Sequence, residues 1–102
     1  MTPGEAFLSQ MLQSNDIYFL ANPKRWWFQG KELAVFTVID SLIADGVEAN
    51  IATVGQKFDP SYVSTLSSLP VTPANWRFFS DKVKRAGMAA ELRKMAQKVE
   101  ED

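Results

Sequence analysis

Two basic side chains followed by three aromatic rings form the one run of this sequence whose residue types suggest ligand binding: Lys24, Arg25, Trp26, Trp27 and Phe28. Cations hold phosphates and aromatic rings stack on bases, so the pattern is one that single-stranded nucleic acid would fit. Lys24, Arg25 and Trp26 are therefore possible nucleic-acid contacts. In the alternative, the rings anchor a loop in the core while the cations stay in solvent. One aromatic cluster without a wider basic surface favours this alternative.

Other chemistry-bearing groups are scarce, because the sequence contains neither cysteine nor histidine. Their absence removes disulfides, thiolate nucleophiles and the commonest general base and metal ligand. The acidic pairs, Asp40 with Asp45 and Glu91 with Glu100 to Asp102, are better explained as charges on helix surfaces. Gly55-Gln56-Lys57 lacks the glycine spacing of a phosphate-binding loop. We therefore expect no catalytic, metal-binding or cofactor-binding residue in this chain.

The composition indicates one folded domain without a bias towards charged partners. Hydrophobic residues make up 46% of the 102 residues, with seven Phe and three Trp, which argues against disorder. Eleven basic and twelve acidic side chains leave a net charge of -1, so nothing draws the whole chain to nucleic acid or anionic membranes. No apolar run approaches the roughly 18 residues that span a bilayer, and the N-terminus lacks a signal-peptide pattern. We expect a cytoplasmic protein with no membrane partner.

Residues 35–58 predict an αα corner around which the other elements should pack. Apolar residues at steps of three and four mark one side of a helix. These residues are Val35, Phe36, Ile39, Leu42 and Ile43. Gly46 follows where a left-handed helix end is expected, and Asn50 is placed to cap a second, shorter helix. The apolar residues of that second helix are Ile51, Val54 and Phe58.

Start signals predict three further short helices. Residues 2–5 have the spacing of a capping box, with proline at the first helical position. Asn15 or Asp16 is placed to cap a second short helix from Ile17 to Leu20. Asp59-Pro60 starts another helix of about two turns after the corner. Together these elements form a globular part over residues 1–72, in one domain of residues 1–102. We predict its core residues to be Phe7, Leu8, Trp27, Phe36, Ile39, Leu42, Val54, Phe58, Leu66 and Phe79.

Residues 73–102 predict one long helix whose apolar side changes halfway. The first half carries Trp76, Phe79 and Val83, and Gly87 lies at the change. The second half carries a stripe at steps of four, three and four, formed by Met88, Leu92, Met95 and Val99. We expect the first half to pack on the globule and the second to reach beyond it as the first arm of a helical hairpin or half of a dimer seam. The alternative is that the stripe folds back on the same core. Mixed charges along this helix favour a solvated face over a DNA-binding stripe.

Several short motifs follow one another in the order found in a known family. They are Ala6 to Leu12, Trp27-Phe28, Val35-Phe36, Leu42, Gly46, Thr53-Val54, Tyr62-Val63, Leu66, Pro70 to Pro73 and Ala74-Asn75. In this order the chain resembles the N-terminal domain of DnaB-type replicative DNA helicases of bacteria or phages. The similarity extends over nearly the whole chain.

The resemblance implies an all-α globule of about five short helices followed by a helical hairpin. In that family, such domains pair through their hairpins into a collar on the hexamer and contact primase or the helicase loader, and DNA only indirectly. ATP, magnesium and strand separation belong to a separate RecA-like domain that this sequence lacks, so the chain itself would be non-catalytic. Two alternatives stay open: the helicase-binding domain of a primase, which is similar in fold, and a small stand-alone protein that binds single-stranded nucleic acid.

Overall fold

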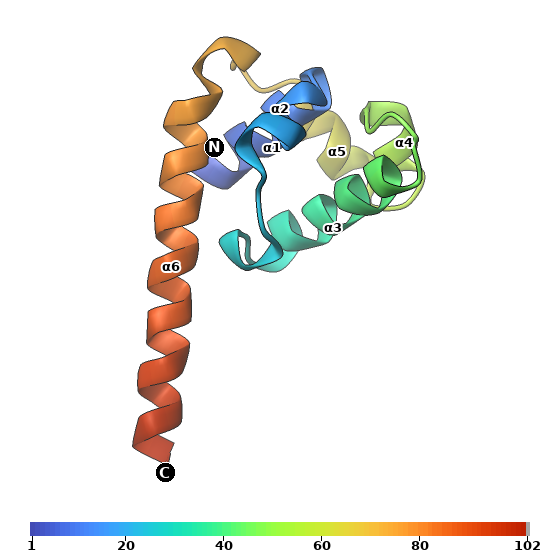
Figure 1. Ribbon diagram of the computed structural model, residues 1–102. Helices are drawn as coiled ribbons and strands as arrows, with labels where there is room; N and C mark the ends of the chain where they lie inside the picture. Colours follow the sequence, from blue (N-terminus) through green and yellow to red (C-terminus); the bar gives the residue numbers. More distant parts are fainter. Residues whose placement is uncertain (102) are drawn as a thin grey trace.

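The chain forms a globule of short helices and one long helix that extends past it (Figure 1). The computed structural model describes the backbone of residues 1–101 and the side chains of residues 1–98. The elements are α1 (Pro3–Gln13), α2 (Asp16–Ala21), the 3₁₀ turn η1 (Arg25–Trp27), α3 (Gly30–Ala44), α4 (Ile51–Gly55), α5 (Pro60–Ser67), the 3₁₀ turn η2 (Pro73–Asn75) and α6 (Trp76–Glu101). No β-strand occurs within residues 1–101. The all-α prediction, with five short helices before a long C-terminal one, is confirmed.

Helix α1 is the most enclosed element of the globule. It begins with the predicted capping box, in which the Glu5 amide donates to Thr2 Oγ1 at 3.0 Å and the Thr2 amide donates to Glu5 Oε1 at 2.9 Å. Every residue from Ala6 to Leu12 is buried, and α1 contacts α2, α3, α5, η2 and α6. We expected the α3–α4 corner to hold this central place. Instead α1 does, because its polar Ser9 and Gln10 are buried together with its apolar residues.

The α3–α4 corner itself forms at the predicted positions, with a shorter second helix. Gly46 has φ +75°, and it and the next residue donate their amides to the last turn of α3 at 3.0 and 2.9 Å, which ends the helix as a Schellman motif. The side chain of Asn50 accepts two amides of α4, both at 3.0 Å. Helix α4 ends at Gly55, and Asp59, the residue before Pro60, is out of the helical region, as is usual before proline. Phe58 therefore lies after the helix, and Ile51 is 47% exposed.

Asn15 joins two parts of the fold and does not cap α2 with its side chain. Its Nδ2 donates to the carbonyls of Met11 at 2.9 Å and Ala49 at 2.8 Å, and its Oδ1 accepts the Ala49 amide at 2.9 Å. Asn15 occupies the expected N-cap position of α2, but its side chain forms no capping hydrogen bond there. The side chain instead links the end of α1 to the connection between α3 and α4, where it satisfies both polar backbone groups of a buried residue.

Stacked aromatic rings connect α1, η1 and α3. The ring of Phe28 stacks on Phe36 with centroids 4.5 Å apart and on Phe7 at 6.3 Å. Eight of the ten residues that we predicted for the core are buried: Phe7, Leu8, Trp27, Phe36, Ile39, Leu42, Val54 and Leu66. The other two, Phe58 and Phe79, are partly buried and packed against the core. Such close packing of flat rings favours one arrangement of the three elements.

Helix α6 starts three residues later than expected. Pro73 begins η2, and α6 proper starts at Trp76. Gln10 of α1 holds this turn, because its Nε2 donates to the Thr72 carbonyl and to Asn75 Oδ1, both at 2.8 Å. The first half of α6 then packs along α1 and η1, and its distal part extends away from the globule (Figure 1).

Gly87 lies where α6 touches η1 most closely. A Cβ atom built on Gly87 would lie 2.5 Å from the Cα of Trp27 and 2.8 Å from the backbone oxygen of Trp26. Real Cβ atoms do not come that close to backbone, so only glycine allows the two elements to touch here. This contact explains why the two apolar stripes of the long helix are separated at this residue.

We expect Gly87→Ala to lower the free energy of unfolding by about 1 to 3 kcal/mol, because α6 must move away from η1. A Gly→Ala substitution within a helix normally raises the free energy of unfolding by about 1 kcal/mol, because alanine favours the helix more than glycine does. At Gly87 we expect the opposite. Urea unfolding followed by circular dichroism measures the difference. The matched control is Gly55→Ala, whose Cβ would be 3.8 Å from its nearest neighbour and should cost nothing. Equal stability of Gly87→Ala and the natural chain would contradict the proposed close contact.

Candidate protein-interaction surface

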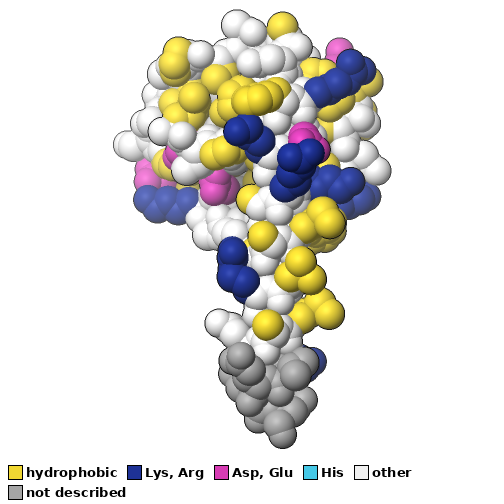
Figure 2. Space-filling model, turned by 90° about the vertical axis from the view of Figure 1, so that its left-hand side faces the viewer, with side chains coloured by type: hydrophobic (Ala, Val, Ile, Leu, Met, Phe, Trp, Pro, Cys, Tyr) yellow, Lys and Arg dark blue, Asp and Glu magenta, His cyan; other side chains and the backbone are white. Residues whose placement is uncertain are grey.

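Three large apolar side chains of α6 point into solvent beyond the globule. Met88 is 49% exposed, Leu92 64% and Met95 62%. Figure 2 shows hydrophobic side chains running down the projecting part of the molecule. We call these three residues the stalk stripe. The fourth residue of the predicted series, Val99, lies outside the residues whose side chains are described.

The spacing of the stalk stripe places it away from the globule. Val83, Gly87 and Ala90 are buried, so they mark the side of α6 that packs on the other helices. With 3.6 residues per turn, Met88 and Leu92 lie roughly 140° and roughly 180° around the helix axis from Val83. The distal half of α6 therefore does not fold back to cover its apolar side chains, which was the alternative interpretation of the sequence. A contiguous exposed apolar surface of this kind is typical of protein–protein contacts.

Charged pairs and cations accompany the stalk stripe. Arg85 Nη2 lies 3.1 Å from Asp81 Oδ2, and Lys94 Nζ lies 3.4 Å from Glu91 Oε1. Both pairs are exposed, and such pairs contribute about 0.5 kcal/mol or less to stability. Lys84 Nζ lies 5.9 Å from the centre of the Trp27 ring. The surface thus combines an apolar centre with polar edges of mixed charge, as many interaction surfaces do.

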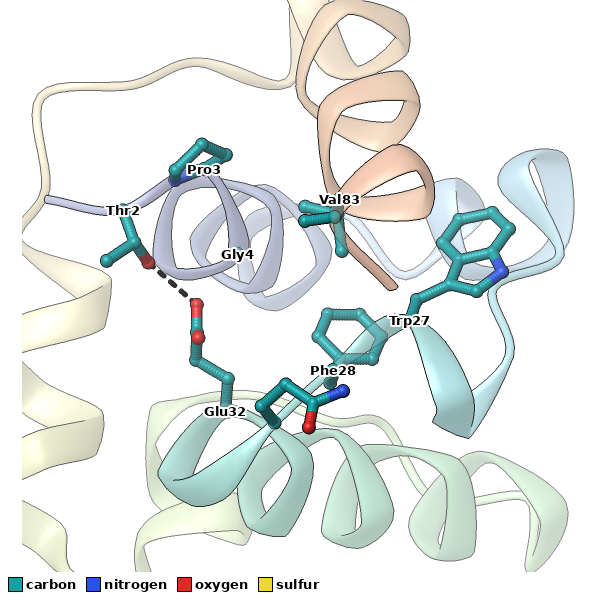
Figure 3. A pocket seen from close by; sticks show the side chains of 9 residues that line it. Thr2, Pro3, Gly4, Trp27, Phe28, Glu32 and Val83 are labelled. Atoms are coloured by element: carbon teal, nitrogen blue, oxygen red, sulfur yellow. Dashed lines mark hydrogen bonds between the residues drawn. The ribbon is translucent and has the colours of Figure 1, made fainter. Parts of the chain in front are cut away.

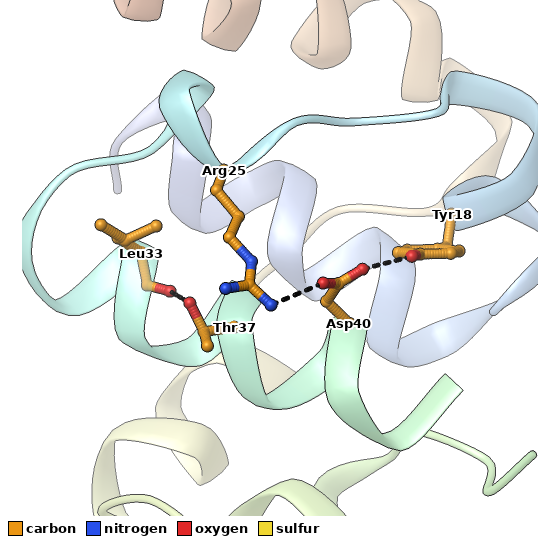
Figure 4. Close-up of polar contacts among 5 residues, drawn as sticks. All are labelled: Tyr18, Arg25, Leu33, Thr37 and Asp40. Carbon is orange, nitrogen blue, oxygen red and sulfur yellow. Dashed lines mark hydrogen bonds and ion pairs between the residues drawn. The ribbon is translucent and has the colours of Figure 1, made fainter. Parts of the chain in front are cut away.

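The possible nucleic-acid contacts, Lys24, Arg25 and Trp26, are all exposed. Arg25 is already engaged, because its Nη2 lies 2.9 Å from Oδ2 of Asp40, whose other oxygen accepts the hydroxyl of Tyr18 (Figure 4). Of the neighbouring rings, Trp27 and Phe28 are buried and Trp26 is 39% exposed. Trp27 and Phe28 therefore anchor η1 in the core, and the ring of Trp26 stays at the surface.

This polar network changes the protonation behaviour of its members. The hydrogen bond from Tyr18 and the nearby Arg25 cation hold the pKa of Asp40 below its ordinary value of 3.8, against the opposite effect of partial burial. The same hydrogen bond to Asp40, together with burial, raises the pKa of Tyr18 to about 12. The network fixes α2 and η1 onto α3 and is best explained as structural.

A groove runs between η1, α3 and the distal part of α6. Its volume is about 350 Å³, and its lining residues are Arg25, Trp26, Phe28, Gln29, Leu33, Thr37, Glu91 and Lys94. Trp26 and two cations meet here, which would suit a stacked base. However, Arg25 is paired with Asp40, and Glu91 at the rim opposes phosphate binding. The geometry thus brings Trp26 and Arg25 together without leaving them a strongly basic surface.

A smaller hollow of about 150 Å³ lies between the start of α1, the start of α3 and α6 (Figure 3). The hydroxyl of Thr2 donates to Glu32 Oε1 at 2.7 Å at its edge. A Cβ on Gly4 would be only 1.9 Å from the same carboxylate oxygen, so Glu32 packs directly on the first turn of α1. A carboxylate at a helix N-terminus is stabilising there. This hollow is a seam between helices, and the Thr2 hydroxyl and the Glu32 carboxylate pair with each other at its edge.

Sequence reasoning missed a second exposed apolar surface, on α2 and the α3–α4 connection. Phe19 is 66% exposed, Leu20 65% and Val47 42%. One signal could have indicated it: residues 17–20 are four consecutive apolar residues, which point to nearly all sides of a short helix. The rest of the chain covers only one side of α2, where Ile17 is buried, so apolar residues on its other sides stay more exposed.

The described residues contain no group of three or more acidic, histidine or cysteine side chains that could hold a metal ion. None of their helices is both long enough and apolar enough to cross a membrane. Comparison of the chain with known protein families, curated proteins and solved structures gave no match.

We expect Asp40→Asn to lower the free energy of unfolding by about 1 kcal/mol at neutral pH, because Tyr18 and Arg25 lose a charged partner. A carboxyl whose pKa is lower in the folded than in the unfolded chain stabilises the fold when the pH is above its ordinary pKa. This contribution is lost as the pH falls towards the folded-state pKa. The difference between the variant and the natural chain should therefore shrink below about pH 4. Urea midpoints at pH 7 and pH 3 measure it. Glu48→Gln, at an exposed loop carboxylate, serves as the control, and an undiminished Asp40→Asn difference at pH 3 would contradict the ionic mechanism.

Proposed function

We propose that this chain is a non-catalytic assembly and docking domain, of the kind found at the N-terminus of DnaB-type replicative DNA helicases. In this role it self-associates through α6 and docks primase or the helicase loader. ATP hydrolysis and strand separation would belong to a separate motor domain. The support consists of the ordered sequence resemblance and an all-α globule with the element order that the resemblance implies.

The observation that carries the proposal is the exposed stalk stripe. Met88, Leu92 and Met95 follow one another along one side of a projecting helix, and each is at least 49% exposed. Covering a leucine or methionine side chain by a partner stabilises a complex by about 1.5 to 3 kcal/mol. Three such side chains in a row are costly to leave in water and suited to pack on another apolar surface.

Self-association through α6 predicts that Leu92→Asp with Met95→Asp reduces the mass in solution to that of one chain. Each buried apolar contact that is lost weakens association about tenfold or more. Light scattering coupled to size-exclusion chromatography, over a range of concentrations, measures the mass. Gln97→Asp is the control, because it adds a negative charge on the other side of the exposed helix and should leave the mass unchanged. A natural chain that stays single at every concentration would contradict self-association.

A pull-down with the helicase and the primase of the same genome distinguishes the helicase domain from its nearest alternative. Capture of primase or loader is expected from a helicase docking domain. Capture of the helicase alone would instead indicate the helicase-binding domain of a primase. Capture of none of these partners would contradict both assignments.

The nucleic-acid alternative has weaker support, because Asp40 pairs with Arg25 and Glu91 stands beside Lys94 at the groove that Trp26 lines. We therefore expect no binding of a fluorescent single-stranded oligonucleotide at low salt, measured by anisotropy. Binding that weakens with added salt and disappears in Trp26→Ala would overturn this expectation in favour of a nucleic-acid-binding protein.

A further inference from the structure

Two of the three side chains in the stalk stripe are methionines. Met88 is 49% exposed and Met95 62%, whereas Met11 in the core is 0% exposed. The chain contains four methionines and no cysteine, so thioethers are its only oxidisable sulfur groups. A peroxide must reach the thioether to oxidise it, and in a single chain it can reach both methionines of the stripe. The fourth methionine, Met1, is 67% exposed at the opposite end of the chain.

The two methionines of the stripe lie on the same side of α6. Met95 follows Met88 by seven residues, which is close to two full helical turns and about 10 Å along the axis. Leu92 lies between them and is 64% exposed. A second α6 that covers Leu92 therefore also covers the side chains one turn before and one turn after it. In the proposed self-association, each chain thus places two thioethers in the apolar seam.

Oxidation makes these side chains polar without changing their charge. The lone pair of the thioether sulfur attacks one peroxide oxygen, an S–O bond forms, the O–O bond breaks, and the second oxygen leaves as water. The sulfur is oxidised and the peroxide is reduced. In a single chain, water can hydrogen-bond to the new sulfoxide oxygen. In a covered apolar seam this strong acceptor lacks a donor, and burial of an unpaired polar group opposes association.

We propose that Met88 and Met95 form an oxidation-sensitive modification site, at which a peroxide converts both thioethers to sulfoxides and thereby prevents self-association through α6. This inference rests on the proposed self-association and names a chemical reaction that regulates it. Because pairing covers the thioethers, the peroxide acts on the unpaired chain and keeps it unpaired.

The modification can be reversed. Two methionine sulfoxide reductases, one for each epimer, return a sulfoxide to the thioether. A pair of thiols supplies the two electrons and becomes a disulfide, and the sulfoxide oxygen leaves as water. The same chain can therefore return to the assembly after oxidation.

The rest of the fold should withstand this treatment. Met88 and Met95 lie outside the hydrophobic core cluster, so their sulfoxides should leave the globule folded. Met11 belongs to that cluster and has no exposed surface, so a peroxide reaches it only when the chain opens. An unoxidised Met11 therefore reports that the chain has stayed folded during the reaction.

Light scattering before and after treatment with hydrogen peroxide tests the proposal, with mass spectrometry to identify the oxidised residues. We expect an assembly before treatment and the mass of one chain when Met88 and Met95 are oxidised and Met11 is not. Each sulfoxide should weaken association about tenfold or more. Treatment with both reductases should restore the assembly, and circular dichroism should show the same helix content throughout.

Two double variants separate the effect of the thioethers from other effects of the peroxide. Met88→Leu with Met95→Leu keeps the stripe apolar, so this chain should associate as the natural chain does and keep its mass in peroxide. Met88→Gln with Met95→Gln places uncharged polar groups at the same positions and should give the mass of one chain without any peroxide. The glutamine variant also covers the case in which peroxide damages the fold.

The possible failures are distinguishable. An oxidised, folded chain that keeps the mass of the natural assembly overturns the modification site while self-association through α6 stands. A leucine variant that also dissociates in peroxide does the same, because the effect would then come from another residue. A natural chain that never exceeds the mass of one copy before treatment overturns the proposed self-association and this inference with it.

Discussion

The contact between Gly87 of α6 and the backbone of Trp26 and Trp27 is the constraint on which the arrangement of the molecule depends. It brings the long helix against η1, and η1 is in turn held by the rings of Trp27 and Phe28 and by the Arg25–Asp40 pair. Beyond this contact and the buried Ala90, the described side chains of α6, from Glu91 to Lys98, are exposed or only partly buried. The position of a single glycine thus decides where the globule ends and where the exposed part of the helix begins.

Features that depend on a few neighbouring residues could be predicted from the sequence. The capping box at Thr2, the N-cap at Asn50, the proline start at Pro60 and the left-handed Gly46 all form where their local patterns indicated. The apolar stripe of α6 was also evident, because its period is that of a helix. The central place of α1 was not, because it depends on the burial of Gln10, whose partners Thr72 and Asn75 lie more than 60 residues away in sequence. Similarly, the exposure of Phe19 and Leu20 depends on which side of α2 the rest of the chain covers.

The two exposed apolar surfaces differ from the core in how they are made. Core side chains such as Phe36 and Ile39 come from long elements that touch several others, so the fold itself gains from their burial. The stalk stripe and the exposed side chains of Phe19, Leu20 and Val47 contribute less to the free energy of folding, because about half of each stays in solvent. Their apolar character has value only when another surface covers them, and for this reason they, and not the hollows between helices, are the candidates for function.

The unbroken course of α6 has a consequence for anything that binds its distal end. A helix of 26 residues is about 39 Å long, and one half of it is embedded in the globule while the other half is free. No loop separates the two halves, so the direction of the free half is set by the packing of the buried half. A partner bound near Met95 is therefore held at a fixed distance and a fixed angle from the globule, as at the end of a rigid arm.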